Sequence, residues 1–287
     1  MNPAVKQTAS ARQRLGSGAA SGLVWVIRVI LPISHDVAAV APRVGFVESR
    51  VECDKLDHVN FEASSSKKPA EVARMFDYAA PSYDLMNALL SIGQDAHWRD
   101  ATTAALDAKP GERVLDLAAG TGASSAPLLH AGADVFSLDR SEGMVAVGRA
   151  RHPEIVFSVG DGEALPFADG AFDAVTVSFG LRNMTHPVAV LRELARVTAA
   201  GGRLIICEFS RPTPLWLRAA YYGWLRLVMP LASILSRNPA SYHYLAQSIL
   251  EWPNQKVVAG WLRSAGWHDV AYRNLSGGIV ALHRGTR

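Results

Sequence analysis

Cysteine is scarce in this chain, and long apolar runs and concentrated charge are absent. Cys53 and Cys207 are the only cysteines in 287 residues, with no CxxC pair and no paired histidine nearby. This argues against a disulfide framework and a bound metal, and it favours a reducing compartment. No apolar run has the length that crosses a bilayer, so an integral membrane protein is not predicted. The net charge of +3 is mild and dispersed, which argues against nucleic-acid binding.

The N-terminal part of the chain differs in character from the rest. An apolar segment at 23–31 follows a basic stretch, as in a signal peptide, but Arg28 interrupts it and Pro42 follows the small residues where cleavage would occur. The sequence therefore predicts a disordered extension over residues 1–66, with a start codon set too early as one explanation and a targeting or membrane-surface segment as the alternative. The folded domain is predicted over 67–287.

From Pro110 onwards, apolar strands alternate with helices. Such alternation predicts an α/β fold with a parallel sheet covered by helices on both faces. The last two strands are joined by a short glycine-rich turn, which predicts an antiparallel hairpin at the edge of the sheet. The expected strands are 113–117, 135–138, 155–159, 172–178, 203–209, 269–274 and 279–283, and the expected helices are 71–78, 83–90, 96–106, 123–130, 143–151, 187–197 and 255–264.

The turn after the first strand indicates a nucleoside-bearing cofactor. Gly120 and Gly122 leave bare backbone N–H groups before a helix, and Asp139 ends the next strand, where an acid can hold a ribose. A dinucleotide site needs a third glycine where this chain has Ser125. Asp116 precedes the turn and suits a cationic amino-acid moiety better than a pyrophosphate. These residues together favour S-adenosyl-L-methionine.

Several further motifs resemble those of the quinone-biosynthesis C-methyltransferases, which comprise the demethylmenaquinone methyltransferases and the bifunctional ubiquinone/menaquinone enzymes. The resemblance extends from about Glu71 to the C-terminus. It implies a class I methyltransferase (Rossmann-like) fold, with a seven-stranded, mostly parallel sheet whose last strand is antiparallel. The motifs that carry it are Arg74-Met75-Phe76-Asp77, Tyr83-Asp84-Leu85-Met86-Asn87, Ser178-Phe179-Gly180-Leu181-Arg182-Asn183, Glu208-Phe209-Ser210 and Gly278-Ile279-Val280-Ala281-Leu282-His283.

The family's cofactor positions carry over onto Thr121, Asp139, the pair Asp161-Gly162, and Ser178. Chemistry agrees with this: the turn at Thr121 can meet the methionine carboxylate with backbone and hydroxyl donors, and Asp139 can accept both ribose hydroxyls. Asp161 is expected near the adenine edge and Ser178 near the reacting centre. The simpler alternatives are a turn-capping acid for Asp139, an ordinary loop acid for Asp161 and a turn former for Ser178.

On the substrate side, Arg182 and Asn183 are the candidate catalytic residues. Arg182 is expected to bind or polarise a quinol oxygen, because a cation lowers the cost of the aryl oxide that pushes electrons to the attacked carbon. A structural salt bridge is the alternative for Arg182, and a turn cap is the alternative for Asn183. Tyr83, Tyr242 and His243 are candidates for lining the site or removing a proton.

An apolar, aromatic insertion spans about 212–246. It is either a helix buried over the sheet or a lid that shelters an isoprenoid tail and contacts the membrane surface, and both can hold at once. The expected partners are therefore a polyprenylated quinol and the inner face of the cell membrane, contacted peripherally from the cytoplasm. A homo-oligomer is compatible with the sequence.

The predicted activity is methyl transfer from S-adenosylmethionine to a ring carbon of a polyprenylated quinol, with demethylmenaquinol favoured as the acceptor. The alternatives are C-methylation of the benzoquinol of ubiquinone synthesis, a bifunctional enzyme, a cofactor-binding module without turnover, and a nicotinamide dehydrogenase. Ser125 at the third glycine position argues against the dehydrogenase.

Overall fold

The computed structural model describes residues 46–48, 69–235 and 239–287. Within the segment for which the sequence predicts disorder, these include strand β1 (Val47–Glu48). The remainder of residues 1–66 lies outside the described residues, so the predicted disorder and the early start codon stay predictions.

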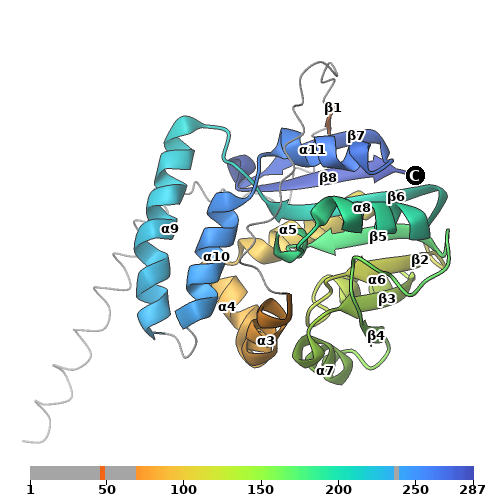
Figure 1. The fold of residues 1–287 in the computed structure, drawn as a ribbon, viewed down its shortest axis with the longest axis horizontal. Helices are drawn as coiled ribbons and strands as arrows, with labels where there is room; N and C mark the ends of the chain where they lie inside the picture. Colours follow the sequence, from red (N-terminus) through yellow and green to blue (C-terminus); the bar gives the residue numbers. More distant parts are fainter. Residues whose placement is uncertain (1–45, 49–68, 236–238) are drawn as a thin grey trace, which may run out of the picture. The chain divides into compact units, whose positions relative to one another are not determined.

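The described strands form one eight-stranded sheet in the order β1-β7-β8-β6-β5-β2-β3-β4 (Figure 1). Strands β2 to β7 run in one direction, while β8 is antiparallel to both of its neighbours and β1 is antiparallel to β7. The bounds are β2 Arg113–Leu117, β3 Asp134–Asp139, β4 Val156–Val159, β5 Phe172–Ser178, β6 Thr198–Phe209, β7 His268–Leu275 and β8 Val280–Thr286.

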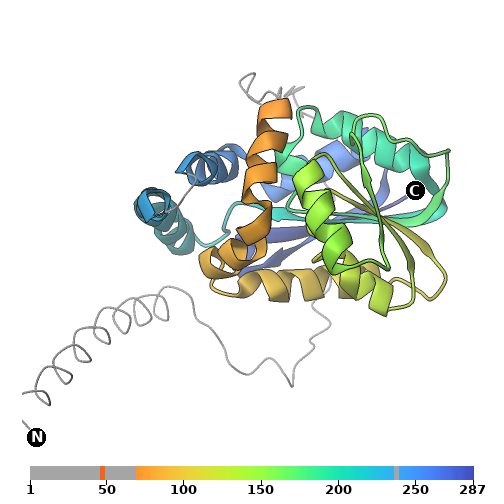
Figure 2. The ribbon, with the colours of Figure 1, turned by 90° about the horizontal axis from the view of Figure 1, so that it is seen from below.

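Helices cover both faces of this sheet, as the sequence predicts. Figure 2 shows α5 and α6 on one face and α8 and α11 on the other, while α3, α4, α9 and α10 lie beyond the carboxyl ends of the parallel strands (Figure 1). The bounds are α3 Pro69–Ala79, α4 Tyr83–Leu90, α5 Gln94–Leu106, α6 Ser125–His130, α7 Glu142–Arg151, α8 Pro187–Val197, α9 Leu215–Leu235, α10 Pro239–Glu251 and α11 Gln255–Ser264.

The main core lies between the sheet and helices α8 and α11. Leu115 and Val175 on the two central strands are fully buried, and so is Leu194 on α8. Strands that are buried on both faces read as nearly continuous apolar runs, which is why β2 and β5 are recognisable in the sequence. The buried side of α8 repeats every three to four residues, the spacing of one face of a helix.

The order of the strands reverses between β2 and β5. From β2 the chain moves outwards through β3 and β4, and it then returns to β5 on the other side of β2. In open parallel sheets, ligands bind outside the carboxyl ends of the strands at such a reversal. The fold therefore positions the loops that follow β2, β3, β4 and β5 around one candidate site.

The predicted antiparallel hairpin is confirmed: β8 pairs with β7 on one side and with β6 on the other. Strand β6 begins at Thr198, ahead of the predicted start at 203, and its pairing with β5 shifts register between Phe172 and Ala174. A register shift accommodates extra residues in one strand, so the strand can continue through glycines that would otherwise predict its end.

In the part of the chain that the structure describes, none of the helices combines the length and apolar character that a membrane span requires.

Candidate active site

The turn after β2 is held in left-handed backbone geometry. Ala118, Gly120 and Gly122 have φ angles of 59°, 56° and 88°. Apart from chain neighbours, no described heavy atom lies within 4 Å of the position that a Cβ on Gly120 would take, whereas a Cβ on Gly122 would approach Phe157 to 2.8 Å. Gly120 therefore leaves the backbone open to a ligand, and Gly122 is required by packing. Strain at an alanine beside such a turn is typical of functional loops.

Asp139 joins this turn to the loop after β3. The backbone N–H of Gly120 donates to its Oδ2 at 2.9 Å, and the N–H of Ser141 donates to its Oδ1 at 2.8 Å. Burial raises the pKa of Asp139, although these backbone hydrogen bonds act in the opposite direction. Two bonds leave lone pairs on both carboxylate oxygens, which is compatible with the predicted contact to ribose hydroxyls.

Asp116 is fully buried beneath the turn, on the strand itself. Ser125 Oγ donates to its Oδ2 at 2.6 Å, and Ser137 Oγ donates to Ser125 Oγ at 2.8 Å. The other oxygen, Oδ1, is buried with no hydrogen-bond partner among the described residues. Burial raises the pKa of Asp116 to about 7, against the opposing effect of the Ser125 hydrogen bond. Ser125, which stands where a dinucleotide site needs a third glycine, thus binds the carboxylate of Asp116.

The loop that follows β4 carries Asp161 and Gly162. Asp161 accepts from the backbone N–H of Glu163 at 3.0 Å and pairs with Arg140 at 3.2 Å. A Cβ on Gly162 would meet Leu117 at 3.2 Å, so this loop passes close to the end of β2. Both oxygens of Asp161 already have partners, and its predicted contact with adenine stays a prediction.

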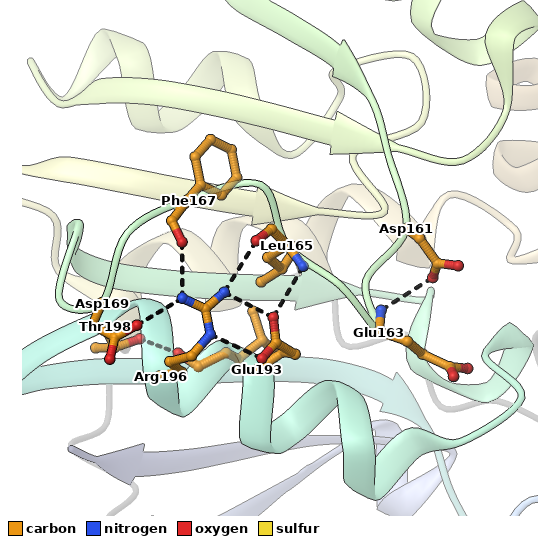
Figure 3. Close-up of polar contacts among 9 residues, drawn as sticks. Asp161, Glu163, Leu165, Phe167, Asp169, Glu193, Arg196 and Thr198 are labelled. Atoms are coloured by element: carbon orange, nitrogen blue, oxygen red, sulfur yellow. Dashed lines mark hydrogen bonds and ion pairs between the residues drawn. The ribbon is translucent and has the colours of Figure 1, made fainter.

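Arg196 on α8 fixes the far part of the same loop. Figure 3 shows its guanidinium donating to the carbonyl oxygens of Leu165 and Phe167 at 3.0 and 2.8 Å, and to the carboxylates of Asp169 and Glu193 at 2.8 and 2.8 Å. The backbone N–H of Leu165 also donates to Glu193. A planar guanidinium that binds two carbonyls and two carboxylates anchors the loop in one conformation.

Ser178 ends β5, next to a second strained position. Its Oγ is buried and lacks a hydrogen-bond partner in the described part of the chain. The following residue, Phe179, has a φ of 57°, and its N–H donates to Cys207 O at 2.8 Å. A Cβ on Gly180 would come within 2.3 Å of Ala118 Cβ. The loops after β2 and β5 therefore touch, which supports a shared site at the strand reversal.

Arg182 forms a buried salt bridge, the alternative that the sequence left open. Arg182 and Glu208 are 4% and 1% exposed, and Nη1 of the arginine donates to Glu208 Oε1 at 2.8 Å. Nη1 also donates to Phe179 O at 2.6 Å, and the guanidinium lies 5.0 Å from the centroid of the Phe209 ring. Burial by itself lowers the pKa of Arg182, but Glu208, together with Tyr83 and Tyr244, raises it, and the net shift is upward. The charge is therefore permanent and largely compensated.

Asn183 follows on the same short helix, Leu181–Asn183. Tyr244 on α10 donates its hydroxyl to Asn183 Oδ1 at 3.1 Å, and Asn183 Nδ2 donates to Phe179 O at 3.4 Å. Of the other predicted candidates nearby, Tyr242 is buried in an apolar cluster and His243 is exposed. The sequence did not single out Tyr244.

Thr121 lies in the turn after β2, and its predicted contact with the methionine carboxylate stays a prediction. Its hydroxyl donates to the carboxylate of Asp84 on α4, at 2.9 and 2.8 Å from the two oxygens, and Asp84 also pairs with Arg151. The hydroxyl is therefore engaged by the protein itself, and only backbone donors of the turn remain for a methionine carboxylate.

Asp77 on α3 accepts hydrogen bonds from the start of α7, much as Asp84 on α4 accepts one from Thr121. It accepts from Ser141 Oγ at 2.6 Å and from the backbone N–H of Gly143 at 2.9 Å, at the start of α7. Asp77 and Asp84 both belong to motifs that carry the family resemblance. No site role was assigned to them from the sequence, because their partners lie far away in the chain.

Thiol and metal chemistry find no support in this region. Burial raises the pKa of Cys207 to about 12, so its thiol stays protonated. Among the described residues, no group of three or more His, Cys, Asp or Glu side chains could hold a metal ion. Cys53 lies outside the described residues.

Solved structures share the fold. A SAM-dependent methyltransferase from Thermotoga maritima aligns with a TM-score of 0.56 at 18% identity, over 75% of this chain and 99% of that one. The [4+2]-cyclase SpnF aligns with a TM-score of 0.51 at 19% identity, over 77% of this chain and 97% of that one. Because a methyltransferase and a cyclase share this architecture, the likeness establishes the class I methyltransferase fold and leaves the chemistry open.

Other relatives are much more similar to this chain in sequence than these solved structures are. Proteins named demethylmenaquinone methyltransferase are 54% identical in Streptomyces griseus, over 78% of this chain and 98% of that protein, and 56% identical in Beutenbergia cavernae, over 77% and 93%. In Mycobacterium bovis the identity is 52%, over 78% and 95%. The model of the ubiE/COQ5 methyltransferase family matches residues 63–287. This chain belongs to the ubiE/COQ5 methyltransferase family.

Proposed function

We propose that this chain transfers a methyl group from S-adenosylmethionine to a ring carbon of a polyprenylated quinol, with demethylmenaquinol as the acceptor. The observation that carries the proposal is the similarity to relatives named demethylmenaquinone methyltransferase, which are 52–56% identical over more than three quarters of the chain. A reaction in the cytoplasm, at the inner face of the cell membrane, is part of the same proposal.

The residues around the turn after β2 fit S-adenosylmethionine. Asp139 has lone pairs to spare for ribose hydroxyls, Asp116 offers an unpartnered buried oxygen and a negative charge for the ammonium, and the backbone at Gly120 is open. When bound, the cofactor supplies an electrophilic methyl group on its sulfonium. The carboxylates attract its positive charges, because Coulombic attraction is strong where water is excluded.

Arg182 and Asn183 support the acceptor side of the proposal. Methylation of the ring needs electron density pushed from a quinol oxygen towards the attacked carbon, and donors near that oxygen stabilise the developing charge. Glu208 compensates the charge of Arg182. We therefore expect Arg182 and Asn183 to stabilise the quinol oxygen more by hydrogen bonding than by net positive charge. Holding the methyl group and the ring carbon in line supplies the remaining rate enhancement.

The first test is direct incubation with methyl-labelled S-adenosylmethionine and a reduced quinone. We expect label in the quinone fraction with demethylmenaquinol, and none with the demethylated benzoquinol of the ubiquinone branch. Label in the benzoquinol alone would move the chain to that branch, and label in both would make it bifunctional. Binding of S-adenosylhomocysteine with no label in either quinol would contradict the proposed activity and leave a binding module.

We further propose that α9 contacts an anionic membrane surface. Leu215, Trp216 and Leu227 are 76%, 61% and 70% exposed. With exposed Ala219 and Pro230 they form a stripe whose members are three, four or eight residues from a neighbour in the stripe, spacings that keep them along one side of the helix. The opposite side packs into an apolar cluster with α10. Of the two alternatives for the insertion, these exposures favour a lid in contact with lipid over a wholly buried helix.

Charge on α9 favours anionic lipid. The helix contains arginines and no acidic residue, and Arg226 is exposed beside the apolar stripe. Apolar and aromatic side chains next to arginine are typical of helices that lie in the membrane interface.

Vesicle flotation tests this contact. The full chain is expected to float with vesicles that contain phosphatidylglycerol, and the double variant Trp216→Gln with Leu227→Gln is expected to lose most of that binding, because burial of these side chains in lipid drives it. Tyr78→Gln, which removes a similarly exposed aromatic residue from α3, serves as the matched control. Equal flotation of both variants, or no flotation of the parent, would rule out this role of α9.

A further inference from the structure

Tyr244 connects the inserted helices to the short helix that carries Arg182 and Asn183. It lies on α10, and its hydroxyl donates to Asn183 Oδ1 at 3.1 Å. These two residues are 61 positions apart in the chain. The hydrogen bond is thus a tertiary contact between the insertion and the loop after β5.

The contact fixes which way the amide of Asn183 points. An amide has a carbonyl oxygen that accepts and an NH₂ group that donates, and the two ends have nearly the same shape. A tyrosine hydroxyl that donates to Oδ1 requires the oxygen to face α10. The NH₂ group then faces the other way, and Nδ2 donates to Phe179 O at 3.4 Å.

Phe179 O is a shared acceptor at this point. It also accepts from Arg182 Nη1 at 2.6 Å, and the residue itself is held at a φ of 57°. Nδ2 of Asn183 carries two hydrogens, and the bond to Phe179 O uses one of them. The second hydrogen can donate to another acceptor, and Nδ2 lies near the guanidinium of Arg182 because both bind Phe179 O.

Tyr244 is suited to a donor role at neutral pH. Burial raises the pKa of its hydroxyl, and Glu208 and Glu251 act in the same direction while Arg182 opposes them. The hydroxyl therefore keeps its proton. Asn183 does not titrate, and its Oδ1 accepts the hydrogen bond from this hydroxyl.

We infer that Tyr244 is a positioning residue for methyl transfer: by binding Asn183 Oδ1, it turns the amide NH₂ towards the quinol oxygen. This inference rests on the proposed function, since it assigns Asn183 to the acceptor. Tyr244 itself acts through Asn183 and touches neither reactant. Without the tyrosine hydroxyl, only the 3.4 Å hydrogen bond to Phe179 O holds the amide, and the NH₂ group can rotate away from the quinol oxygen.

The variant Tyr244→Phe removes only the hydroxyl. We expect kcat for methylation of demethylmenaquinol to fall about ten-fold, the effect of one lost orienting hydrogen bond, with KM for S-adenosylmethionine unchanged. Tyr272→Phe is the matched control, because that tyrosine is partly buried against the main core and lies on β7, away from the candidate site. Its kcat is expected to stay within two-fold of the parent.

A double-mutant cycle separates positioning from stabilisation of α10. In an Asn183→Ala background, Tyr244→Phe is expected to change kcat by less than two-fold, because the residue through which it acts is gone. An equal loss in both backgrounds, or parental kcat for Tyr244→Phe alone, would overturn the inference. If the parent protein does not methylate demethylmenaquinol at all, the proposed function fails instead, so the two failures are distinguishable.

Discussion

Replacing Asp116 by asparagine is expected to weaken binding of S-adenosylmethionine while making the ligand-free protein more stable above pH 7. Asp116 is fully buried, and burial raises its pKa from 3.8 to about 7. The ionised form is therefore costly to bury without a cation beside it. Asparagine is neutral and keeps an oxygen that can accept from Ser125 Oγ, the donor to Asp116 Oδ2. The gain in the free energy of unfolding is at most about 4 kcal/mol.

The loss of affinity follows from the same charge. A hydrogen bond or ion pair to a charged group contributes about 1.5–3 kcal/mol, so the dissociation constant is expected to rise about 10- to 100-fold at pH 8. Titration calorimetry with S-adenosylmethionine measures this affinity, and urea unfolding measures the stability. Asp134→Asn, at an exposed aspartate that begins β3, removes the same charge at the surface and controls for net charge.

The pH dependence has a definite sign. Because the folded-state pKa of Asp116 lies above its unfolded value, proton binding stabilises the folded state fully below pH 4, and this contribution is lost as the pH rises through about 7. Cofactor affinity changes in the opposite direction, since the attracting form is the carboxylate, and it is expected to be about ten-fold lower at pH 6 than at pH 8. The asparagine variant should lack both dependences. A variant with parental affinity at both pH values would show that Asp116 does not face the cofactor.

Breaking the buried ion pair by Glu208→Gln is expected to cost about 3–5 kcal/mol of stability and to abolish most of the activity. The carboxylate of Glu208 accepts from Arg182 Nη1 at 2.8 Å, from the backbone N–H of Arg182 at 3.2 Å and from that of Phe209 at 2.9 Å. Without it, a permanent cation remains buried with reduced compensation. Scanning calorimetry should report a fall in Tm on the order of 10 °C.

A surface pair provides the control for this change. Glu154 lies 3.7 Å from His152 and is half-exposed, so Glu154→Gln is expected to change stability by about 0.5 kcal/mol or less. The double variant Arg182→Met with Glu208→Leu tests the cause, because apolar residues of similar size often restore the stability that is lost when one partner of a buried pair is removed. It should regain stability without regaining activity. A Glu208→Gln variant as stable as the parent would contradict the proposed importance of the pair.

Much of the fold was predictable because its signals are local. Strands β2 and β5 are buried on both faces and read as apolar runs, and the helices between strands show a regular apolar spacing. The order of the last strands was less accessible. The free edge of β6 could pair with either strand of the hairpin, and no residue in the hairpin encodes by itself that β8 takes this place.

The candidate site was predictable in part. Asp139 lies where the sequence expects it, at the end of β3 and against the glycine turn. The ligand contacts expected of Thr121 and Arg182 stay predictions, but their protein partners, Asp84 and Glu208, were not predicted. Such partners come from helices and strands remote in sequence, and one sequence carries no sign of which distant side chain completes a hydrogen bond.

By itself, the sequence determined the class of fold, the nature of the cofactor turn and the family resemblance, because each is written in short runs of residues whose spacing follows backbone geometry. The tertiary structure alone decided which side chains meet. It joined Ser125 to Asp116, and it selected Tyr244 rather than its neighbours as the partner of Asn183. Successive residues of a helix differ by about 100° in direction, so only the docking of α10 onto the loop after β5 determines which of them faces the site.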